Sequence, residues 1–418
     1  MKVSRRWRNL ILHSPSLWST IKVTPTWHEP LVREHVANSC QHPLNIEICS
    51  WSEMESHGRL VALLDIVTPC VHRWRSLAIR DDSTEPHRCL VLELLNHMTF
   101  PTLTSVSMLD VPPYLDGFEG SSMECLAFLA PENCPYLKFL ELGGLFVTMM
   151  PFWVPSGLLN LRLVFDDPFG EDPPFFLGLL SCRNLTSLSL PGELWTFDQL
   201  SPNSIQFPLL ETLVCSVRSA KGLMQALVAP VLSHFEYCPP IWDASPDDVF
   251  AGLGDKFSSV IRLVLSSMDP LHEAKAIYST FPNVCHMVLG PQDSIPIFRL
   301  GDDSPSEATW HHLKSLTVDG PKPIRGLSTF LHHLVRWLKY RQHTRQSKLQ
   351  VRLCMVYATR DWNHLWNLHE MLHELCILEW AGVRLNMKMS LFGDSESLLL
   401  VCMPTFLYHI GASLTLFV

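Results

Sequence analysis

One short pattern of apolar residues recurs along the chain and constrains its fold more than any other feature. Apolar side chains occupy the first, fourth and sixth positions of a six-residue window, and ten such windows occur in the 418 residues. The middle apolar residues of successive windows are 21 to 34 residues apart. A module of this size cannot bury a core alone, so successive modules must stack. The windows are Trp74/Leu77/Ile79, Leu103/Val106/Met108, Leu137/Leu140/Leu142, Leu158/Leu161/Leu163, Leu185/Leu188/Leu190, Leu210/Leu213/Cys215, Leu232/Phe235/Tyr237, Val260/Leu263/Leu265, Val284/Met287/Leu289 and Leu313/Leu316/Val318.

The last two apolar positions of each window have the spacing of a strand with one buried face. Helix signals lie between windows: Ser245-Pro246 and Asp269-Pro270 each offer a capping side chain followed by proline at the first helical position. A strand, a crossover helix and a second strand form a parallel pair. The pattern therefore predicts an α/β fold, a solenoid like that of leucine-rich repeats with a curved parallel sheet and outer helices.

The recurring position of proline supports a true repeat. The alternative is that a chain rich in leucine produces the windows by chance. It precedes five windows at a similar offset, where it stops a helix and favours extended backbone. The windows lack the Asn or Cys that caps the turn in common leucine-rich repeats, so we expect irregular repeats with variable loops, of which Asp166–Pro174 is the clearest. We also expect an earlier strand over Pro43–Ile48 and an amphipathic helix over Leu327–Gln346. The proline prefixes are Phe100-Pro101, Asn133-Cys134-Pro135, Phe207-Pro208, Ala229-Pro230 and Phe281-Pro282.

Composition restricts the classes of protein to which this chain can belong. With 47% hydrophobic and 17% charged residues, the chain can bury a core and is not intrinsically disordered. A net charge of −9 and a pI near 6.1 argue against a nucleic-acid binder. The 13 cysteines include no Cys-x-x-Cys pair, which indicates free thiols in a reducing compartment, the cytoplasm or nucleus. The basic amino terminus precedes only the short apolar run Leu10–Leu12, so we expect no secretion signal.

A more specific motif lies at the amino terminus. Two segments carry it, Val3-Ser4-Arg5-Arg6-Trp7-Arg8-Asn9-Leu10 and Ser14-Pro15-Ser16-Leu17-Trp18-Ser19-Thr20-Ile21. They resemble the second half of an F-box, and together with the repeats the chain resembles fungal F-box proteins with degenerate leucine-rich repeats. The Leu-Pro and helix of the first half have no counterpart in these residues. We therefore expect either a truncated copy or a start upstream of Met1.

The resemblance implies docking to the Skp-family adaptor of a cullin-RING ubiquitin ligase. The residues with counterparts in the F-box contact set are Trp7, Leu10, Pro15, Leu17 and Trp18. The residues alone allow a second interpretation, in which Trp7 and Trp18 pack against each other in a short helical hairpin that caps the first repeat.

Motifs for catalysis or metal binding are not found. The sequence contains no Walker glycine loop, no Gly-x-Ser-x-Gly and no His-Glu-x-x-His motif. His369 and His373 would share a helix face, but a zinc site needs three or four converging ligands. Acidic pairs such as Asp166-Asp167 lie in predicted turns, and the basic run from Arg336 to Lys348 fits either an acidic partner or a helix dipole. We expect neither an enzyme nor a bound cofactor or metal.

Residues between the buried positions of each strand point to the opposite, concave face of the predicted sheet. We expect this face to bind a protein substrate, and the alternative is a solvated sheet face. The candidate residues are Glu141, Asn160, Arg162, Ser187, Ser189, His234, Glu236, Arg262 and His286.

The last 22 residues, Ser397–Val418, carry no formal charge and are long enough to span a bilayer. Pro404 and His409 interrupt the run, so we expect a buried strand pair or a misread gene end, and the alternative is a membrane tail anchor. The expected domains are partial F-box helices at 1–23, irregular repeats at 42–390 and an apolar segment at 391–418.

The predicted function is substrate recognition for an SCF-type ubiquitin ligase. The alternative is a leucine-rich-repeat scaffold for protein interaction that never contacts the ligase.

Overall fold

The structure is a computed structural model in which the chain divides into two compact units, Met1–Leu232 (unit 1) and Ser233–Val418 (unit 2). It describes residues 4–49, 51, 57–81, 85–110, 126–144, 155–164, 182–192, 197, 200–217, 220–238, 249–266, 275–290, 298, 310–319, 327–343, 347–354 and 370–381.

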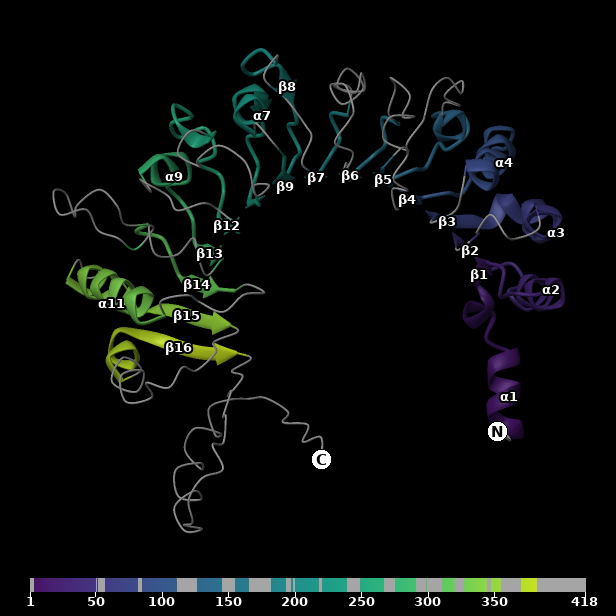
Figure 1. Ribbon diagram of the computed structural model, residues 1–418, viewed down its shortest axis with the longest axis horizontal. Helices are drawn as coiled ribbons and strands as arrows, with labels where there is room; N and C mark the ends of the chain where they lie inside the picture. Colours follow the sequence, from purple (N-terminus) through teal and green to yellow (C-terminus); the bar gives the residue numbers. More distant parts are fainter. Residues whose placement is uncertain are drawn as a thin grey trace, which may run out of the picture. The chain divides into compact units, whose positions relative to one another are not determined.

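Unit 1 contains a parallel sheet whose strands pair in chain order (Figure 1). These strands are β1 (Thr20–Val23), β2 (Leu44–Cys49), β3 (Trp74–Asp81), β4 (Ser105–Asp110), β5 (Phe139–Gly143), β6 (Asn160–Val164), β7 (Ser187–Pro191) and β9 (Thr212–Ser216). A separate parallel pair joins β8 (Ile205–Gln206) and β10 (Leu227–Val228). The described helices of unit 1 are α1 (Arg5–Leu12), η1 (Pro15–Trp18), α2 (Glu29–Asn38), α3 (His57–Val67), η2 (Thr68–Arg73), α4 (Glu85–Asn96), η3 (Ala127–Leu129) and α7 (Ala220–Ala226). In Figure 1, α2, α3 and α4 lie on the same side of the strands.

Unit 2 repeats the same architecture. Its strands also pair in parallel and in chain order, and α9 and α11 lie on one side of them in Figure 1. The strands are β11 (His234–Tyr237), β12 (Arg262–Leu265), β13 (His286–Leu289), β14 (Ser315–Val318), β15 (Leu349–Cys354) and β16 (Cys376–Ala381), and the helices are α9 (Lys275–Thr280) and α11 (Leu327–His343).

The core of each unit is built from the predicted windows. All thirty apolar residues of the ten windows are buried. Their middle residues pair in register from strand to strand, as Leu140 does with Leu161 in unit 1 and Leu263 with Met287 in unit 2. Burying each such side chain contributes about 1.5–3 kcal/mol. The predicted α/β class with parallel strands and helices is therefore confirmed, and the arrangement within each unit is compatible with a solenoid.

A tight turn precedes the strand in eight of the ten windows. In these windows the residue three before the first apolar residue is buried, and its carbonyl accepts a hydrogen bond from the N–H of that apolar residue, as in Phe100 to Leu103 and Trp310 to Leu313. Prolines of the predicted prefixes follow this buried residue. The buried residues of these turns include Phe100, Cys134, Cys182, Phe207, Ala229, Phe257 and Trp310.

Side chains in these turns also tie each repeat to the one before it. Thr102 Oγ1 donates to the carbonyl of His72 at 2.9 Å. Asn184 Nδ2 reaches the carbonyl of Ser156 at 2.7 Å, and Asn283 Nδ2 reaches that of Ser258 at 2.9 Å. Backbone groups that a strand ladder does not pair are thus satisfied by polar side chains from the next repeat.

The parallel strands extend beyond the ten windows at both ends of the chain. β1 occupies the last four residues of the segment 1–23, which we expected to be helical, because Ile21 pairs in register with Ile46 of β2. The strand expected over Pro43–Ile48 is β2. At the other end, β15 and β16 continue the register, with Val351 opposite Leu378.

Other expectations fall partly outside the described residues. The helix expected over Leu327–Gln346 is α11, which ends at His343. The loop Asp166–Pro174, the helix starts at Ser245 and Asp269, and the segment 391–418 lie outside the described residues. Within the described part of the chain, no helix is both long and apolar enough to cross a membrane.

Candidate protein-binding surfaces

The amino-terminal helix α1 presents its apolar side chains to solvent. Ser4 begins the helix by accepting the Trp7 N–H at 3.3 Å, and no residue of α1 is buried. Trp7, Leu10 and Ile11 share one side of the helix, because they are three and four residues apart, and are 63%, 53% and 37% exposed. Leu17 of η1 is 58% exposed. We call Trp7, Leu10, Ile11 and Leu17 the amino-terminal apolar surface.

The position of Trp18 differs from that of the other adaptor-binding candidates. Its indole N–H donates to the carbonyl of Ile11 at 2.8 Å, which ties η1 to the end of α1. Its ring packs edge-on against His35 of α2 at 4.9 Å, and the Trp27 ring also contacts that imidazole, at 4.8 Å. Trp18 therefore holds α1 and η1 against the first repeat. The interpretation in which Trp7 packs against Trp18 is wrong, because Trp7 stays largely exposed.

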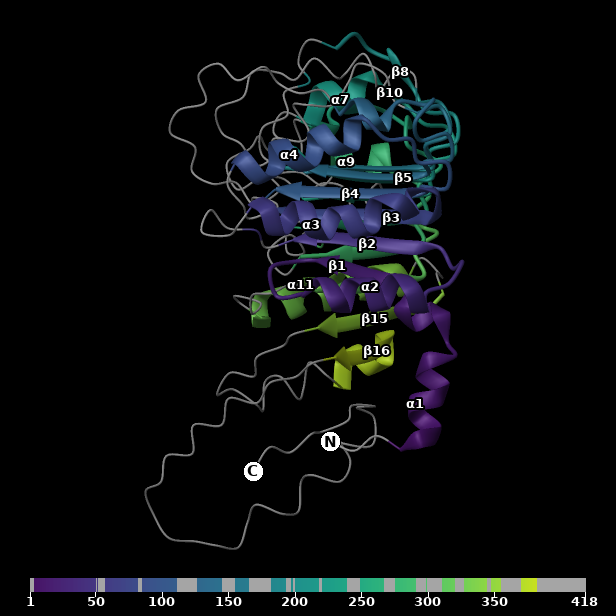
Figure 2. The same ribbon diagram turned by 90° about the vertical axis from the view of Figure 1, so that its right-hand side faces the viewer.

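Figure 2 shows α1 extending beyond the β1 end of unit 1. Pro15 is half-buried at the start of η1, and the Ser14 hydroxyl donates to the carbonyl of Leu10 at 2.7 Å. Three of the five adaptor-binding candidates, Trp7, Leu10 and Leu17, are thus on the surface.

The substrate-binding candidates of unit 1 form adjacent rows on the exposed face of the sheet. Glu141 of β5 is in register with Arg162 of β6, and Arg162 with Ser189 of β7. Asn160 is likewise in register with Ser187. The Arg162 guanidinium lies 3.3 Å from the Glu141 carboxylate, which makes an ion pair between neighbouring strands.

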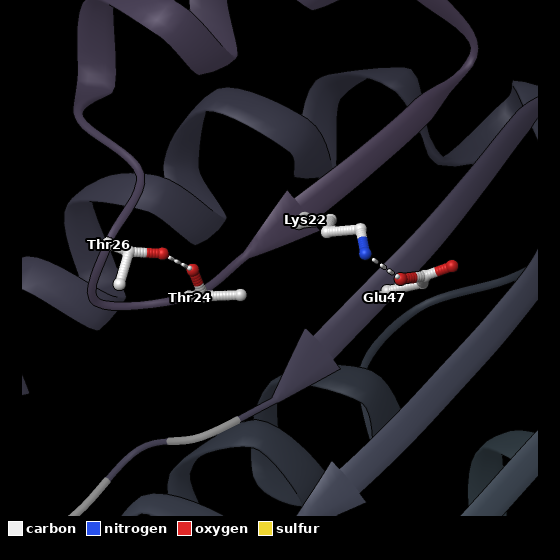
Figure 3. Close-up of polar contacts among 4 residues, drawn as sticks. All are labelled: Lys22, Thr24, Thr26 and Glu47. Atoms are coloured by element: carbon white, nitrogen blue, oxygen red, sulfur yellow. Dashed lines mark hydrogen bonds and ion pairs between the residues drawn. The ribbon is translucent and has the colours of Figure 1, made fainter. Parts of the chain in front are cut away.

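The same face contains polar residues that the sequence interpretation missed. Ser107 of β4 donates to the second carboxylate oxygen of Glu141 at 2.6 Å. Lys22 of β1 pairs with Glu47 of β2 at 3.2 Å (Figure 3). The hydroxyls of Thr24 and Thr26 lie 2.8 Å apart just beyond β1 (Figure 3). Register is the missing signal for the pairs Ser107–Glu141 and Lys22–Glu47, since the sheet places the two residues of each pair opposite one another.

The unit 2 candidates also form a row. His234 of β11 is in register with Arg262 of β12, and Arg262 with His286 of β13. His286 Nδ1 lies 2.8 Å from the Ser315 hydroxyl of β14. Burial is the main cause that lowers the pKa of His234, and the positive charge of Arg262 adds to it, whereas Glu236 opposes the shift. At neutral pH the His234 imidazole is therefore uncharged.

The described residues offer no metal centre. Within the described ranges, no three His, Cys, Asp or Glu side chains converge on a point that could hold a metal ion. His373 is exposed, while His369 and Asp166-Asp167 lie outside these ranges. Among the described basic residues of the run, Arg341 is the buried one, and its guanidinium donates to the carbonyls of Trp310 and Leu313 at 2.6 and 3.0 Å. That cation holds the fold together and is not available to a partner.

No model of a known protein family matches the chain, and no curated protein matches its sequence. The fold and the surfaces define the class: an α/β protein of stacked parallel strand modules whose exposed sheet faces carry both polar and apolar residues.

Proposed function

We propose that the protein is the substrate-recognition subunit of an SCF-type cullin-RING ubiquitin ligase. The amino-terminal apolar surface docks to the Skp-family adaptor, and the exposed sheet faces bind the target protein. The subunit performs no bond chemistry, since it acts by raising the effective concentration of the target at the ligase.

The observation that carries the proposal is the exposure of α1. An amphipathic helix normally buries its apolar side against the rest of the fold. Here Trp7, Leu10 and Ile11 are exposed together, which is typical of a helix that a partner's groove receives. These residues lie in the segment that resembles the second half of an F-box.

The position of Trp18 favours a second candidate function, a leucine-rich-repeat scaffold without ligase association. Trp18, one of the residues that carry the F-box resemblance, packs against His35 of the same chain. A scaffold would use the same sheet faces and leave α1 as a cap.

Isothermal titration calorimetry of the full chain with a purified fungal Skp-family adaptor distinguishes the two. Buried aromatic anchors of interfaces contribute about 2 kcal/mol or more, so Trp7→Ala should weaken adaptor binding by about thirtyfold. Tyr136→Ala is a matched control, because Tyr136 is 62% exposed and Trp7 63% exposed, and Tyr136 lies in the turn before β5. Unchanged affinity is expected for this control. Absence of binding by the folded wild-type chain would overturn the ligase function and leave the scaffold.

A further inference from the structure

We propose that the exposed face of unit 2 binds an extended peptide in which an acidic side chain is followed, two residues later, by an apolar side chain. The inference rests on the proposed function to the extent that this peptide belongs to the ligase substrate, and it names the chemical class of that substrate.

A row of nitrogen-bearing side chains forms the first half of the site. His234, Arg262 and His286 occupy matched positions on three adjacent parallel strands, β11, β12 and β13. Neighbouring strands are about 4.8 Å apart, so the three side chains start within about 10 Å of one another. We call these three residues the basic row. Arg262 and His286 are exposed and His234 is half-buried.

Arg262 has different neighbours from two other arginines of the sheet faces, Arg162 and Arg352, each of which has a carboxylate opposite it. Arg162 lies 3.3 Å from Glu141, and Arg352 lies 3.6 Å from Glu379. In the part of the chain that the structure describes, Arg262 has two imidazoles in register beside it and forms no ion pair. A guanidinium in this position can bind an incoming carboxylate through two parallel hydrogen bonds.

The second half of the site is apolar. Val264 and Val288 lie two residues beyond Arg262 and His286 on β12 and β13, and Thr317 of β14 is in register with Val288. All three are half-buried. We call them the apolar row. Two residues of an extended strand span about 6.6 Å, which is also the distance between alternate side chains of an extended peptide. A peptide aligned with the strands therefore places an acid on the basic row and its next-but-one side chain on the apolar row.

Glu236 selects a carboxylate over a doubly charged group. It follows His234 by two residues on β11 and is in register with Val264, so its carboxylate lies on the same face as the basic row. A second negative charge on the ligand would be repelled there, while a single carboxylate is compensated by the positive charge of Arg262. His234 Nε2 is buried and has no hydrogen-bond partner among the described residues.

Fluorescence anisotropy of the full chain with short fluorescein-labelled peptides tests the proposal. The probe carries one Glu two residues before a Val in an otherwise Ser and Thr sequence, and the matched probes have Gln for the Glu or Ser for the Val. Hydrogen bonds to charged groups predict that the Gln probe binds at least tenfold more weakly than the Glu probe. Arg262→Gln should remove the difference between these two probes. Val264→Thr, which keeps the shape of the side chain, should remove the preference for Val.

Arg183→Gln serves as the matched control, because Arg183 is an exposed arginine in the turn before β7 of unit 1. It should leave every probe affinity unchanged. Equal binding of the Glu and Gln probes to the wild-type chain would overturn the proposal. Displacement of the Glu probe by inorganic phosphate at lower concentration than by unlabelled peptide would also overturn it, in favour of a small-anion site.

The adaptor titration separates this inference from the ligase function. Adaptor binding without any preference for the Glu probe overturns only the substrate class. A clear Glu preference in a chain that does not bind the adaptor overturns only the ligase function and supports the peptide site.

Discussion

Two adjacent residues of β6 provide a sharp test of the repeat architecture, because they lie on opposite faces of the sheet. Leu161 is 1% exposed and is the middle apolar residue of its window. Arg162 is on the exposed face, in an ion pair with Glu141. Leu161→Ala leaves a cavity in the core and should lower the free energy of unfolding by about 2–5 kcal/mol. Arg162→Ala removes only a surface ion pair, which contributes about 1 kcal/mol or less.

Thermal unfolding followed by circular dichroism measures the difference. For a unit of this size, 1 kcal/mol shifts the melting temperature by about 2–4 °C. Leu161→Ala should therefore lower it by roughly 4–20 °C, and Arg162→Ala by less than about 4 °C. Equal shifts, or a larger shift for Arg162→Ala, would refute the assignment of alternate residues to core and surface.

Three further predictions concern buried polar groups. Burial raises the pKa of the Cys134 thiol to about 12. Iodoacetamide at about pH 8 should therefore modify the exposed Cys40 and spare Cys134 in the folded chain. Mass spectrometry measures the labelling, and equal labelling of the two cysteines would contradict this prediction. The fold lowers the pKa of His234 from 6.5, so unfolding takes up a proton and the free energy of unfolding falls as the pH drops below about 6.5. Urea titrations of His234→Asn should show a weaker loss at acid pH than the wild type, and an identical loss would be the opposite result. Arg341→Met leaves two carbonyls without their donor and should lower the free energy of unfolding by about 2–3 kcal/mol. The control Lys339→Met, on the exposed side of α11, should lower it by less than about 0.5 kcal/mol. Similar losses for the two variants in urea titrations would count against the buried role of Arg341.

The sequence predicted the stacked strands well because burial is encoded directly in the spacing of apolar residues. A side chain such as Leu188 or Leu263 can be assigned to the core from its window alone. The proline prefixes also helped to locate the strands, since they mark the turn that begins a repeat. β15 escaped the search because Lys348, which is not apolar, stands three positions before its middle residue Val351. β1 does fit the window, as Trp18/Ile21/Val23, but this segment was expected to be helical.

The direction of individual side chains could not be predicted in the same way. Trp7 and Trp18 belong to one motif, yet one is exposed and the other contacts His35 across a tertiary interface. Arg341 belongs to the basic run that was assigned to an acidic partner or a helix dipole, but its guanidinium reaches two carbonyls of the turn before β14. These contacts depend on where neighbouring repeats place their turns, which a single stretch of sequence does not contain.

The candidate sheet surfaces could be predicted only in part. Alternation placed Arg262 and His286 on the exposed face correctly, because strand period alone decides the face. Their alignment beside His234 needed the register of three strands separated by long connections. Sequence therefore identified the members of the basic row, and the structure showed that they are neighbours.

Hydrogen–deuterium exchange of the full chain with and without a saturating Skp-family adaptor tests the central claim most directly. Docking through the amino-terminal apolar surface predicts slower exchange in peptides covering α1 and η1, with the strands of both units unchanged. Exchange in α1 and η1 that stays as fast with the adaptor as without it, at concentrations where calorimetry detects a complex, would contradict that claim.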